Sequence, residues 1–277
     1  MQLYFGFEEF PRDVATVVTV GSFDGVHAGH RVLLDRVHSL ATRLEAKSVV
    51  VTFEPHPRIA MGRAEGMKLL TTVEERAALL EQAGVDYVVV AYFDDKFRSQ
   101  SFGDFVRESL VAKLGMRGLV VGYNHRLGRG NEGRYETLLP IAEECGFVLE
   151  RVEQHTATGA KISSTVVRGE LEMGNAARAA ELMGHPYIIY GTAESGVVTL
   201  TNEHKLLPAE GLYIATVSPC PHSVAQGGGQ SVEQDKVQSG EQDEMQSKMQ
   251  RVTIKRDGIT LSEPLSGELL IAIHSRL

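Results

Sequence analysis

Cysteine is scarce in this sequence, since only Cys145 and Cys220 occur among 277 residues. The two cysteines lack the spacing of metal ligands, and so low a content is typical of a reducing compartment. No charged segment followed by an apolar core stands at the N-terminus, and the apolar runs are too short to span a bilayer. We therefore expect a soluble cytoplasmic protein without a membrane partner.

Positive charge is also in deficit. The chain has 28 Lys and Arg against 36 Asp and Glu, a net charge of −8. This balance excludes broad electrostatic binding to nucleic acid, so any phosphate is expected to bind at a confined site. The length and the 43% hydrophobic content suit one large or two modest globular domains.

Runs of β-branched and apolar residues alternate with helical patterns in the first half of the chain. The helical patterns cover 33–44, 72–83 and 101–114. Such alternation predicts a parallel sheet with helices on both faces, and ligand sites beyond the carboxyl ends of its strands. The predicted strands are 16–20, 48–53, 87–90, 119–122 and 147–152.

The turn at 21–30 reads Gly-Ser-Phe-Asp-Gly-Val-His-Ala-Gly-His and joins the first strand to a helix. A helix N-terminus offers unpaired N–H groups and positive potential, which favour a phosphate chain, and glycines let it approach closely. His27 and His30 are expected to lie together on the first helical turn and to donate to phosphate oxygens. The alternative is that they are capping or surface residues.

Two further motifs follow predicted strands. Pro55 and Pro57 hold His56 in an extended backbone, although prolines also merely end strands. Asn124 and Arg126 follow the fourth strand, where the planar fork of an arginine suits phosphate. The alternative for that segment is a surface loop with a solvated arginine.

A fourth motif, Ile-Ser-Ser-Thr-Val-Val-Arg at 162–168, places three hydroxyls at a predicted helix start and Arg168 one turn later. Hydroxyls at this place cap the helix and can also bind a phosphate. Capping alone is the simpler interpretation of the motif.

These motifs carry a family resemblance. Phe-Asp-Gly-Val-His-x-Gly-His contains the HxGH signature of nucleotidylyltransferases and resembles the FMN adenylyltransferase module of bacterial bifunctional riboflavin kinase/FAD synthetases. The strings Thr-Phe-x-Pro-His-Pro and Ile-Ser-Ser-Thr-x-x-Arg occur in that family in the same order. The resemblance covers about residues 16–187, with Leu127 in place of the family's aromatic residue.

The resemblance implies that the enzyme transfers AMP from ATP to FMN, giving FAD and pyrophosphate. It assigns catalytic contacts to His27, His30 and Arg168, and Mg²⁺ bridging the phosphates without dedicated protein ligands. For Asp24, support of the turn or its metal and a purely structural Asx turn are equally acceptable. The implied nucleotide-binding residues are Gly21, Ser22, Phe23, Asp24, Gly25, Gly29, Ser163, Ser164 and Thr165. The implied flavin- and phosphate-binding residues are Phe53, Pro55, His56, Pro57, Asn124 and Arg126.

The second half has a different pattern of short extended segments, at 187–192, 196–200, 211–217, 251–255 and 268–274. It resembles the riboflavin kinase barrel, but 193–205 lacks the family's Gly-Arg-x-x-Gly-x-Pro-Thr-Ala-Asn string. Gln recurs every fourth position from 226 to 250, a low-complexity pattern with too little apolar area to order the backbone.

We therefore predict a Rossmann-like α/β nucleotidylyltransferase domain at 1–185. A smaller, shortened antiparallel β-barrel-like domain without kinase activity is expected at 186–277, with a disordered insert at about 221–250. Two alternatives for the function stay open: transfer to another phosphorylated acceptor, and a flavin- or nucleotide-binding regulator without turnover.

Overall fold

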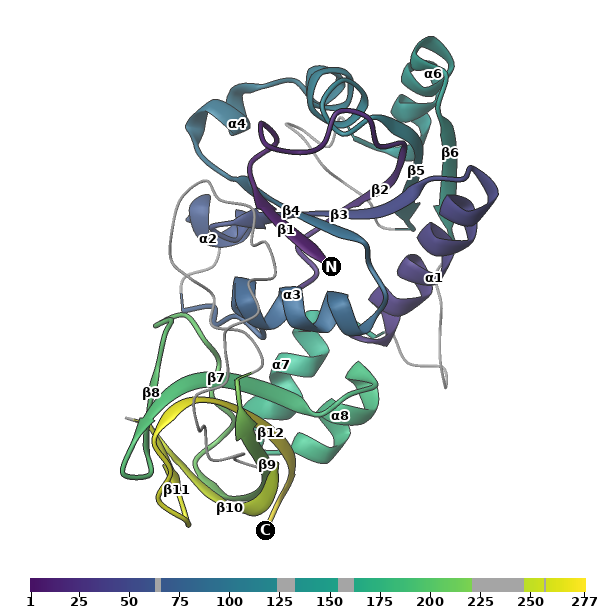
Figure 1. Cartoon of the computed structure of the whole chain (residues 1–277). Coiled ribbons are helices and arrows are strands. Elements are labelled where there is room, and N and C mark those ends of the chain that lie inside the picture. The colour runs from purple at the N-terminus through teal and green to yellow at the C-terminus, as the bar shows by residue number, and fades with distance from the viewer. Residues whose placement is uncertain (63–65, 124–132, 154–161, 221–246, 257) are drawn as a thin grey trace, which may run out of the picture.

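The computed structural model describes residues 1–62, 66–123, 133–153, 162–220, 247–256 and 258–277. The sheet and its helices occupy the upper part of Figure 1, and a β-barrel in green and yellow lies below them. An α/β domain followed by an antiparallel barrel is the fold class that the sequence predicts. Within the described ranges, no helix is both long and apolar enough to cross a membrane.

Among the described residues, six strands form one sheet in the order β1, β4, β3, β2, β5, β6. All neighbouring strands run parallel. The five predicted strands are confirmed, and β1 adds an edge strand that the pattern did not indicate. The strands are β1 (Gln2–Phe5), β2 (Thr16–Val20), β3 (Lys47–Glu54), β4 (Tyr87–Tyr92), β5 (Met116–Gly122) and β6 (Val148–Val152).

The direction of chain progress reverses beside β2. From β2 the chain proceeds outward through β3 to β4, then crosses back and continues from β5 to β6 on the other side of β2. Open α/β sheets bind ligands in the crevice at such a switch point, outside the carboxyl ends of the strands. The Gly-rich turn directly follows β2, so the topology places it at this crevice.

Helices cover both faces of the sheet, because successive strand side chains point to opposite sides. On one face Val18 and Val20 belong to a cluster with Phe105 and Leu110. On the other face Val17 belongs to a cluster with helix residues of α1. The helices of this region are α1 (Ala28–Arg43), α2 (Pro57–Ala60), α3 (Val73–Gln82), α4 (Asp95–Ser99), α5 (Phe102–Asp104) and α6 (Tyr135–Cys145), with the π-helix η1 (Phe105–Val111).

Two of the predicted helical segments show how local sequence sets their form. Thr72 starts α3 with a capping box, in which its hydroxyl accepts from Glu75 N and its own N–H donates to the Glu75 carboxylate. The predicted 101–114 segment consists of the short α5 followed by η1. Its apolar side chains, including Phe105 and Leu110, are buried as predicted.

In the second half, six strands of the described residues close into an antiparallel barrel, in the order β10, β11, β8, β7, β12, β9. Its interior is a packed core, since inward side chains such as Ile189, Val217, Val252 and Ile271 form one apolar cluster. The strands are β7 (Tyr187–Glu194), β8 (Val197–Leu200), β9 (Gly211–Pro219), β10 (Lys248–Lys255), β11 (Gly258–Leu261) and β12 (Gly267–Arg276). The pattern did not indicate β11.

The predicted insert extends too far at its C-terminal end. Residues 221–246 lie outside the described residues, but strand β10 begins at Lys248, inside the predicted insert. Gln250 is the last glutamine of the repeat, and its side-chain oxygen accepts from Glu263 N at 3.0 Å. Pairing with β9 and this partly buried hydrogen bond order residues 248–250, which composition alone assigned to the insert.

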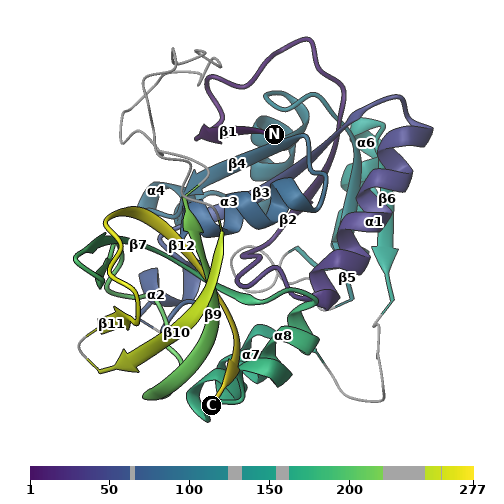
Figure 2. The ribbon, with the colours of Figure 1, turned by 60° about the horizontal axis from the view of Figure 1, so that its bottom comes forward.

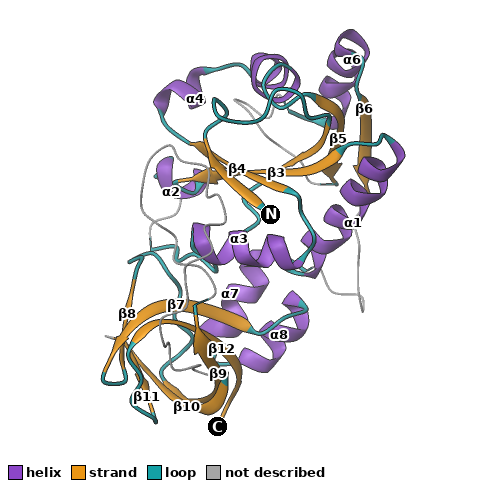
Figure 3. Ribbon diagram, in the orientation of Figure 1, coloured by secondary structure: helices purple, strands orange, loops and turns teal. Residues whose placement is uncertain are grey.

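Helices α7 (Ser164–Glu172) and α8 (Ala176–Met183) lie next to the barrel, as Figures 1 and 2 show from two sides. Val167 and Leu171 of α7, with Ala179 and Met183 of α8, belong to the apolar cluster of the barrel. Figure 3 shows both helices beside the barrel strands. By packing they therefore join the barrel, although we predict the domain boundary at 185/186 from the sequence.

Candidate active site

The Gly-rich turn is tightly built. Phe23, Gly25 and Val26 have positive φ values of 47°, 84° and 36°. A Cβ added to Gly25 would lie 2.7 Å from Leu70 Cδ1, so both the backbone angle and the space require glycine. Positive φ is unusual for Phe and for a β-branched Val, and such strain persists only where surrounding structure enforces it. The conformation of the turn is therefore imposed by the structure that surrounds it.

The two histidines of the turn lie where they were predicted. Their rings stack with centroids 3.7 Å apart and planes 10° apart, and Phe23 contacts the ring of His30. His27 is the N-cap of α1 but its side chain makes no capping bond. The first-turn N–H groups therefore keep the character of an anion site. A Cβ on Gly29 would lie 3.2 Å from the His27 ring, so glycine makes room for the stack.

Both imidazoles are neutral near pH 7. Burial lowers the pKa of His27 to about 4 and lowers the pKa of His30 well below its ordinary value. Nearby cations add to the effect, since Arg76 further lowers the pKa of His30. The Nδ1 atoms of both rings are buried without a hydrogen-bond partner within the described residues. Buried polar atoms of this kind are candidates for ligand contact.

The start of α7 docks on the same turn. Ser163 caps the helix by accepting from Val166 N, as the capping interpretation predicts. The Ser164 hydroxyl donates to the Asp24 carbonyl at 2.9 Å, and Arg168 Nη2 lies 2.5 Å from Asp24 Oδ2. The HxGH turn and the Ser-Ser-Thr motif are therefore in direct contact, while Thr165 is exposed beside them.

Asp24 is a structural centre of this contact. Its Oδ1 accepts from Thr71 N at 2.9 Å and from the Thr71 hydroxyl at 3.2 Å, and its Oδ2 pairs with Arg168. Arg168 Nε also donates to the Lys68 carbonyl. Both carboxylate oxygens thus bind protein groups rather than a neighbouring N–H of the turn. These contacts favour support of the turn over an Asx turn.

The end of β3 lies at the same sheet edge. Gly21 N donates to Val51 O, and the Thr52 hydroxyl donates to the Ser22 carbonyl, so β3 is tied to the turn. Phe53 is a core residue that packs against Phe93 and Phe97.

The histidine that follows β3 caps a short helix. His56 is buried, and its Nδ1 accepts from Arg58 N at the start of α2. Burial lowers the pKa of His56 to about 4. Pro55 is exposed and Pro57 half-buried on either side of it, after a cis Glu54–Pro55 bond. Asn124 and Arg126 lie outside the described residues.

The donors near the turn do not form a metal centre. Within the described ranges no group of three or more His, Cys, Asp or Glu side chains could hold a metal ion. The nearest buried carboxylate, Asp24, already uses both oxygens. Mg²⁺ at this site would therefore fit as an ion held by phosphate oxygens and water, which agrees with its tendency to retain water ligands.

Arg76 is a site residue that the sequence analysis missed. It is buried on α3, where Nη1 donates to the Thr52 hydroxyl at 2.6 Å, and its Nε and Nη2 have no partner within the described residues. Through Thr52 it connects α3 to Ser22 of the turn. The local sequence carries no signal for it, because Arg76 follows two glutamates and only tertiary packing buries it together with Glu75.

The connection to the barrel also touches the turn. His185 Nε2 lies 3.1 Å from the Gly25 carbonyl, and its Nδ1 lies 2.8 Å from the Pro186 carbonyl. Gly25 N donates to the Thr71 hydroxyl. Nothing in the local sequence pattern predicts the two contacts of Gly25, because they join segments far apart in the chain.

Comparisons with known proteins agree with this geometry. A family model described as FAD synthetase matches residues 10–166. A bifunctional riboflavin kinase/FMN adenylyltransferase of Escherichia coli (strain K12) is 36% identical over 180 residues, 65% of this chain and 58% of that protein. The chain thus aligns with little more than half the length of that relative. A FAD synthetase of Listeria monocytogenes serovar 1/2a is 30% identical over 72% of this chain and 80% of that protein.

One solved structure covers nearly the whole chain. A crystal structure titled a macrolide-efflux protein from Streptococcus pneumoniae has a TM-score of 0.78 and 20% identity, over 99% of this chain and 98% of that one. At that identity it shows a shared fold. The FAD synthetase match covers more than half of the chain and contains the stacked histidines together with the start of α7, so the chain belongs to the FAD synthetase family.

Proposed function

We propose that this protein is an FMN adenylyltransferase, which transfers AMP from ATP to FMN and releases pyrophosphate. One observation carries the proposal: the HxGH turn and the Ser-Ser-Thr motif meet at Asp24, at the switch point of the sheet. Two phosphate-binding motifs that converge on one crevice suit the triphosphate of ATP better than either would alone.

The chemistry needs no protein nucleophile. A phosphate oxygen of FMN attacks the α-phosphorus of ATP in line, a new P–O bond forms, and the bond to the bridging oxygen of the β-phosphate breaks. Pyrophosphate leaves with the electron pair of that bond. Catalysis then depends on orientation and on stabilising the charge of the leaving group.

His27 and His30 are proposed to contact the phosphates. Both rings are neutral because burial lowers their pKa values. A bound triphosphate favours the protonated forms, so the pair gains donor strength as negative charge collects on pyrophosphate. The nucleotide lies, in this proposal, along Gly21, Ser22, Phe23, Asp24, Gly25 and Gly29.

The start of α7 is proposed to hold the β- and γ-phosphates. The Ser164 hydroxyl contacts the turn at the Asp24 carbonyl, and Ser163 and Thr165 stand next to it at the helix start. Arg168 is buried against Asp24 and fastens the helix to the turn. A contact between its guanidinium and phosphate is a proposal that the variant Arg168→Lys would test, because lysine cannot reproduce the planar fork.

The flavin is proposed to bind beside the end of β3. Pro55, His56 and Pro57 follow this end of the strand, and Phe53 precedes them in the core. Asn124 and Arg126 are proposed to orient the phosphate of FMN. Mg²⁺, held by phosphate oxygens, would neutralise part of the triphosphate charge when bound.

We further propose that the barrel does not phosphorylate riboflavin, because residues 193–205 lack the family's nucleotide-binding string. The working unit is a 1–185 catalytic domain with a 186–277 barrel domain. The acidic charge and scarce cysteine support a cytoplasmic enzyme whose partners are ATP and FMN, without nucleic acid or membrane.

The test is chromatography of purified protein incubated with ATP and Mg²⁺ plus either FMN or riboflavin. FAD from FMN and no FMN from riboflavin is the expected result. FMN formed from riboflavin would contradict the assignment of the barrel. No product from either flavin would refute the adenylyltransferase and favour another phosphorylated acceptor or a binding role.

A further inference from the structure

The barrel presents the phosphate motif of α7 to the turn. One face of α7 packs in the barrel cluster through Val167 and Leu171. Its other contacts, from Ser164 and Arg168, reach Asp24 of the first domain. Helix α7 is therefore clamped between the two parts of the molecule, so the position of the barrel sets the position of the phosphate motif.

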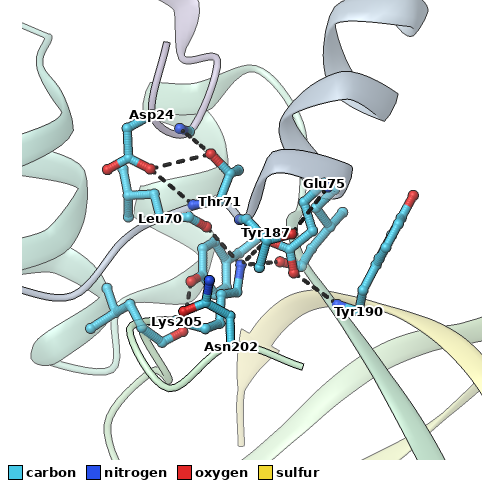
Figure 4. A network of polar contacts seen from close by, with 12 residues as sticks. Asp24, Leu70, Thr71, Glu75, Tyr187, Tyr190, Asn202 and Lys205 are labelled. Atoms are coloured by element: carbon cyan, nitrogen blue, oxygen red, sulfur yellow. Dashed lines mark hydrogen bonds and ion pairs between the residues drawn. The ribbon is translucent and has the colours of Figure 1, made fainter. Parts of the chain in front are cut away.

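A lysine of the barrel domain is buried at the contact between the two domains, which we call the junction. Lys205 lies between β8 and β9, and its side chain is 1% exposed. Its three ammonium hydrogens have three acceptors, Leu70 O at 2.6 Å, Glu75 Oε2 at 2.6 Å and Ile188 O at 2.8 Å. Figure 4 shows the Nζ atom at the centre of this network, and the ammonium also lies 4.3 Å from the centre of the Tyr187 ring.

Both oxygens of the carboxylate that pairs with Lys205 accept hydrogen bonds from the protein. Glu75 Oε1 accepts from Tyr190 N of β7, and Oε2 accepts from Thr72 N of the capping box. Burial raises the pKa of Glu75 and lowers that of Lys205, while the attraction between the two charges opposes both changes. The pair joins α3 of the first domain to β7 of the barrel.

From Lys205 a short path leads to the nucleotide turn. We call residues 69–71 the strap. Leu69 pairs with the segment around Lys205, since Leu69 N donates to His204 O and Leu206 N donates to Leu69 O. Lys205 holds the carbonyl of Leu70, and the next residue, Thr71, binds the turn at Asp24 and Gly25. Figure 4 shows Asp24, Thr71, Leu70 and Lys205 in this sequence.

We propose that Lys205 is a positioning residue of the nucleotide site, through which the barrel fixes the strap and so the phosphate-binding turn. The inference rests on the proposed function for the identity of the nucleotide, ATP. It gives the barrel a role that needs no kinase activity. A barrel without a role at the site would not need a buried ammonium that binds the carbonyl of Leu70, the residue next to Thr71.

Loss of Lys205 alone would destabilise the protein, because Glu75 would stay as an unpaired buried charge. The informative variant is therefore Lys205→Met combined with Glu75→Gln, which removes both charges and keeps side chains of similar volume. A second variant, Thr71→Val, removes the strap hydroxyl at the other end of the path with an almost unchanged shape. Lys248→Met, an exposed lysine of β10, is the matched control.

The experiment measures three quantities for each full-length variant: the thermal midpoint, the Kd of MgATP by calorimetry, and the KM values for ATP and FMN. We expect the double variant and Thr71→Val to bind ATP about tenfold or more weakly, since lost hydrogen bonds to positioned groups have this size. The KM for FMN should stay close to that of the wild type. The thermal midpoint of the double variant should lie above that of Lys205→Met, although the amide nitrogen of Glu75→Gln cannot accept one of the two backbone hydrogen bonds that Glu75 accepts.

Two results would overturn the inference. One is an unchanged Kd for ATP in both the double variant and Thr71→Val. The other is an equal loss of ATP and FMN binding, which would indicate general destabilisation. Failure of the proposed function is distinguishable, because the wild type would then form no FAD, while the calorimetry of ATP still tests the path from Lys205.

Discussion

The Gly-rich turn and the domain junction are both buried and polar, but they differ in how many of their polar groups are hydrogen-bonded. At the turn, His27 Nδ1 and His30 Nδ1 have no partner within the described residues, and Val26 has positive φ. At the junction, each hydrogen of Lys205 Nζ has an acceptor, and Glu75 accepts on both oxygens. Unpaired buried groups and strained backbone cost free energy, which the rest of the fold must supply.

The comparison separates polar groups without a protein partner, which are candidates for ligand binding, from polar groups whose hydrogen bonds stabilise the fold. An unsatisfied histidine pair costs stability, and we propose that it binds phosphate, whereas a saturated ion pair contributes order at the junction. Variants at the turn should therefore reduce activity more than stability. Variants at the junction that leave one charge unpaired should reduce stability first.

The largest effect on stability is expected from Lys205→Met. Removing one partner of a buried ion pair costs about 3–5 kcal/mol, because the other charge stays buried and unpaired. Urea unfolding followed by circular dichroism measures the change, and addition of Glu75→Gln should recover part of it by removing the unpaired charge. A single variant within about 1 kcal/mol of the wild type would show that the junction does not stabilise the fold as described.

At the turn, His27→Ala should slow FAD formation by ~10²–10³, about 2.7–4 kcal/mol in the barrier, as for other lost donors in dry sites. Its thermal midpoint should fall less than that of Lys205→Met, since the variant loses the stack with His30 but no hydrogen bond of Nδ1. Single-turnover kinetics at saturating ATP and FMN measure the rate. His204→Ala, an exposed histidine, is the control, and equal rates for both variants would refute the role of His27.

The pH dependence of stability should sharpen the contrast. The pKa of His27 is about 4 in the folded protein and near 6.5 when unfolded, so the unfolded state binds more protons between these values. Stability is then fully present above pH 6.5 and is lost as the pH falls toward 4, by on the order of 2–4 kcal/mol. Urea midpoints of the wild type and of His27→Gln, measured across this pH range, give the change in stability. The stability of the variant should depend less on pH. Identical pH profiles for the two proteins would contradict the account.

The smallest effect is expected on the barrel surface. Lys248 pairs with Glu263 in a 2.5 Å ion pair whose partners are 61% and 46% exposed. Exposed pairs contribute about 0–1 kcal/mol, so Lys248→Met should change neither the urea midpoint nor the Kd of ATP measurably. A large loss here would mean that the barrel responds to any charge removal, which would weaken the inference from Lys205.

Much of this architecture could be predicted from local sequence. The β-branched runs marked five strands of the sheet, and the cap of α3 at Thr72 followed from its Thr and Glu. The contact between His27 and His30 followed from their spacing at a helix start. These features depend on residues close together in the chain.

What could not be predicted depends on contacts between distant segments. Edge strand β1 pairs with β4, some 85 residues away, and its four residues carry too short a pattern to stand out. Lys205 and Arg76 look like surface charges in the sequence, yet tertiary packing buries both. The predicted C-terminal bound of the disordered insert was wrong, because Gln250 pairs with β9 although the composition around it is that of a disordered segment.

The most direct test of the account follows phosphorus through the reaction. Purified protein is incubated with FMN, Mg²⁺ and ATP labelled at either the α- or the γ-phosphorus, and the flavins are separated from pyrophosphate. The account predicts that the α-label enters FAD and that the γ-label leaves in pyrophosphate. A γ-label in any flavin product, or no labelled flavin from α-labelled ATP, would contradict adenylyl transfer at the HxGH turn.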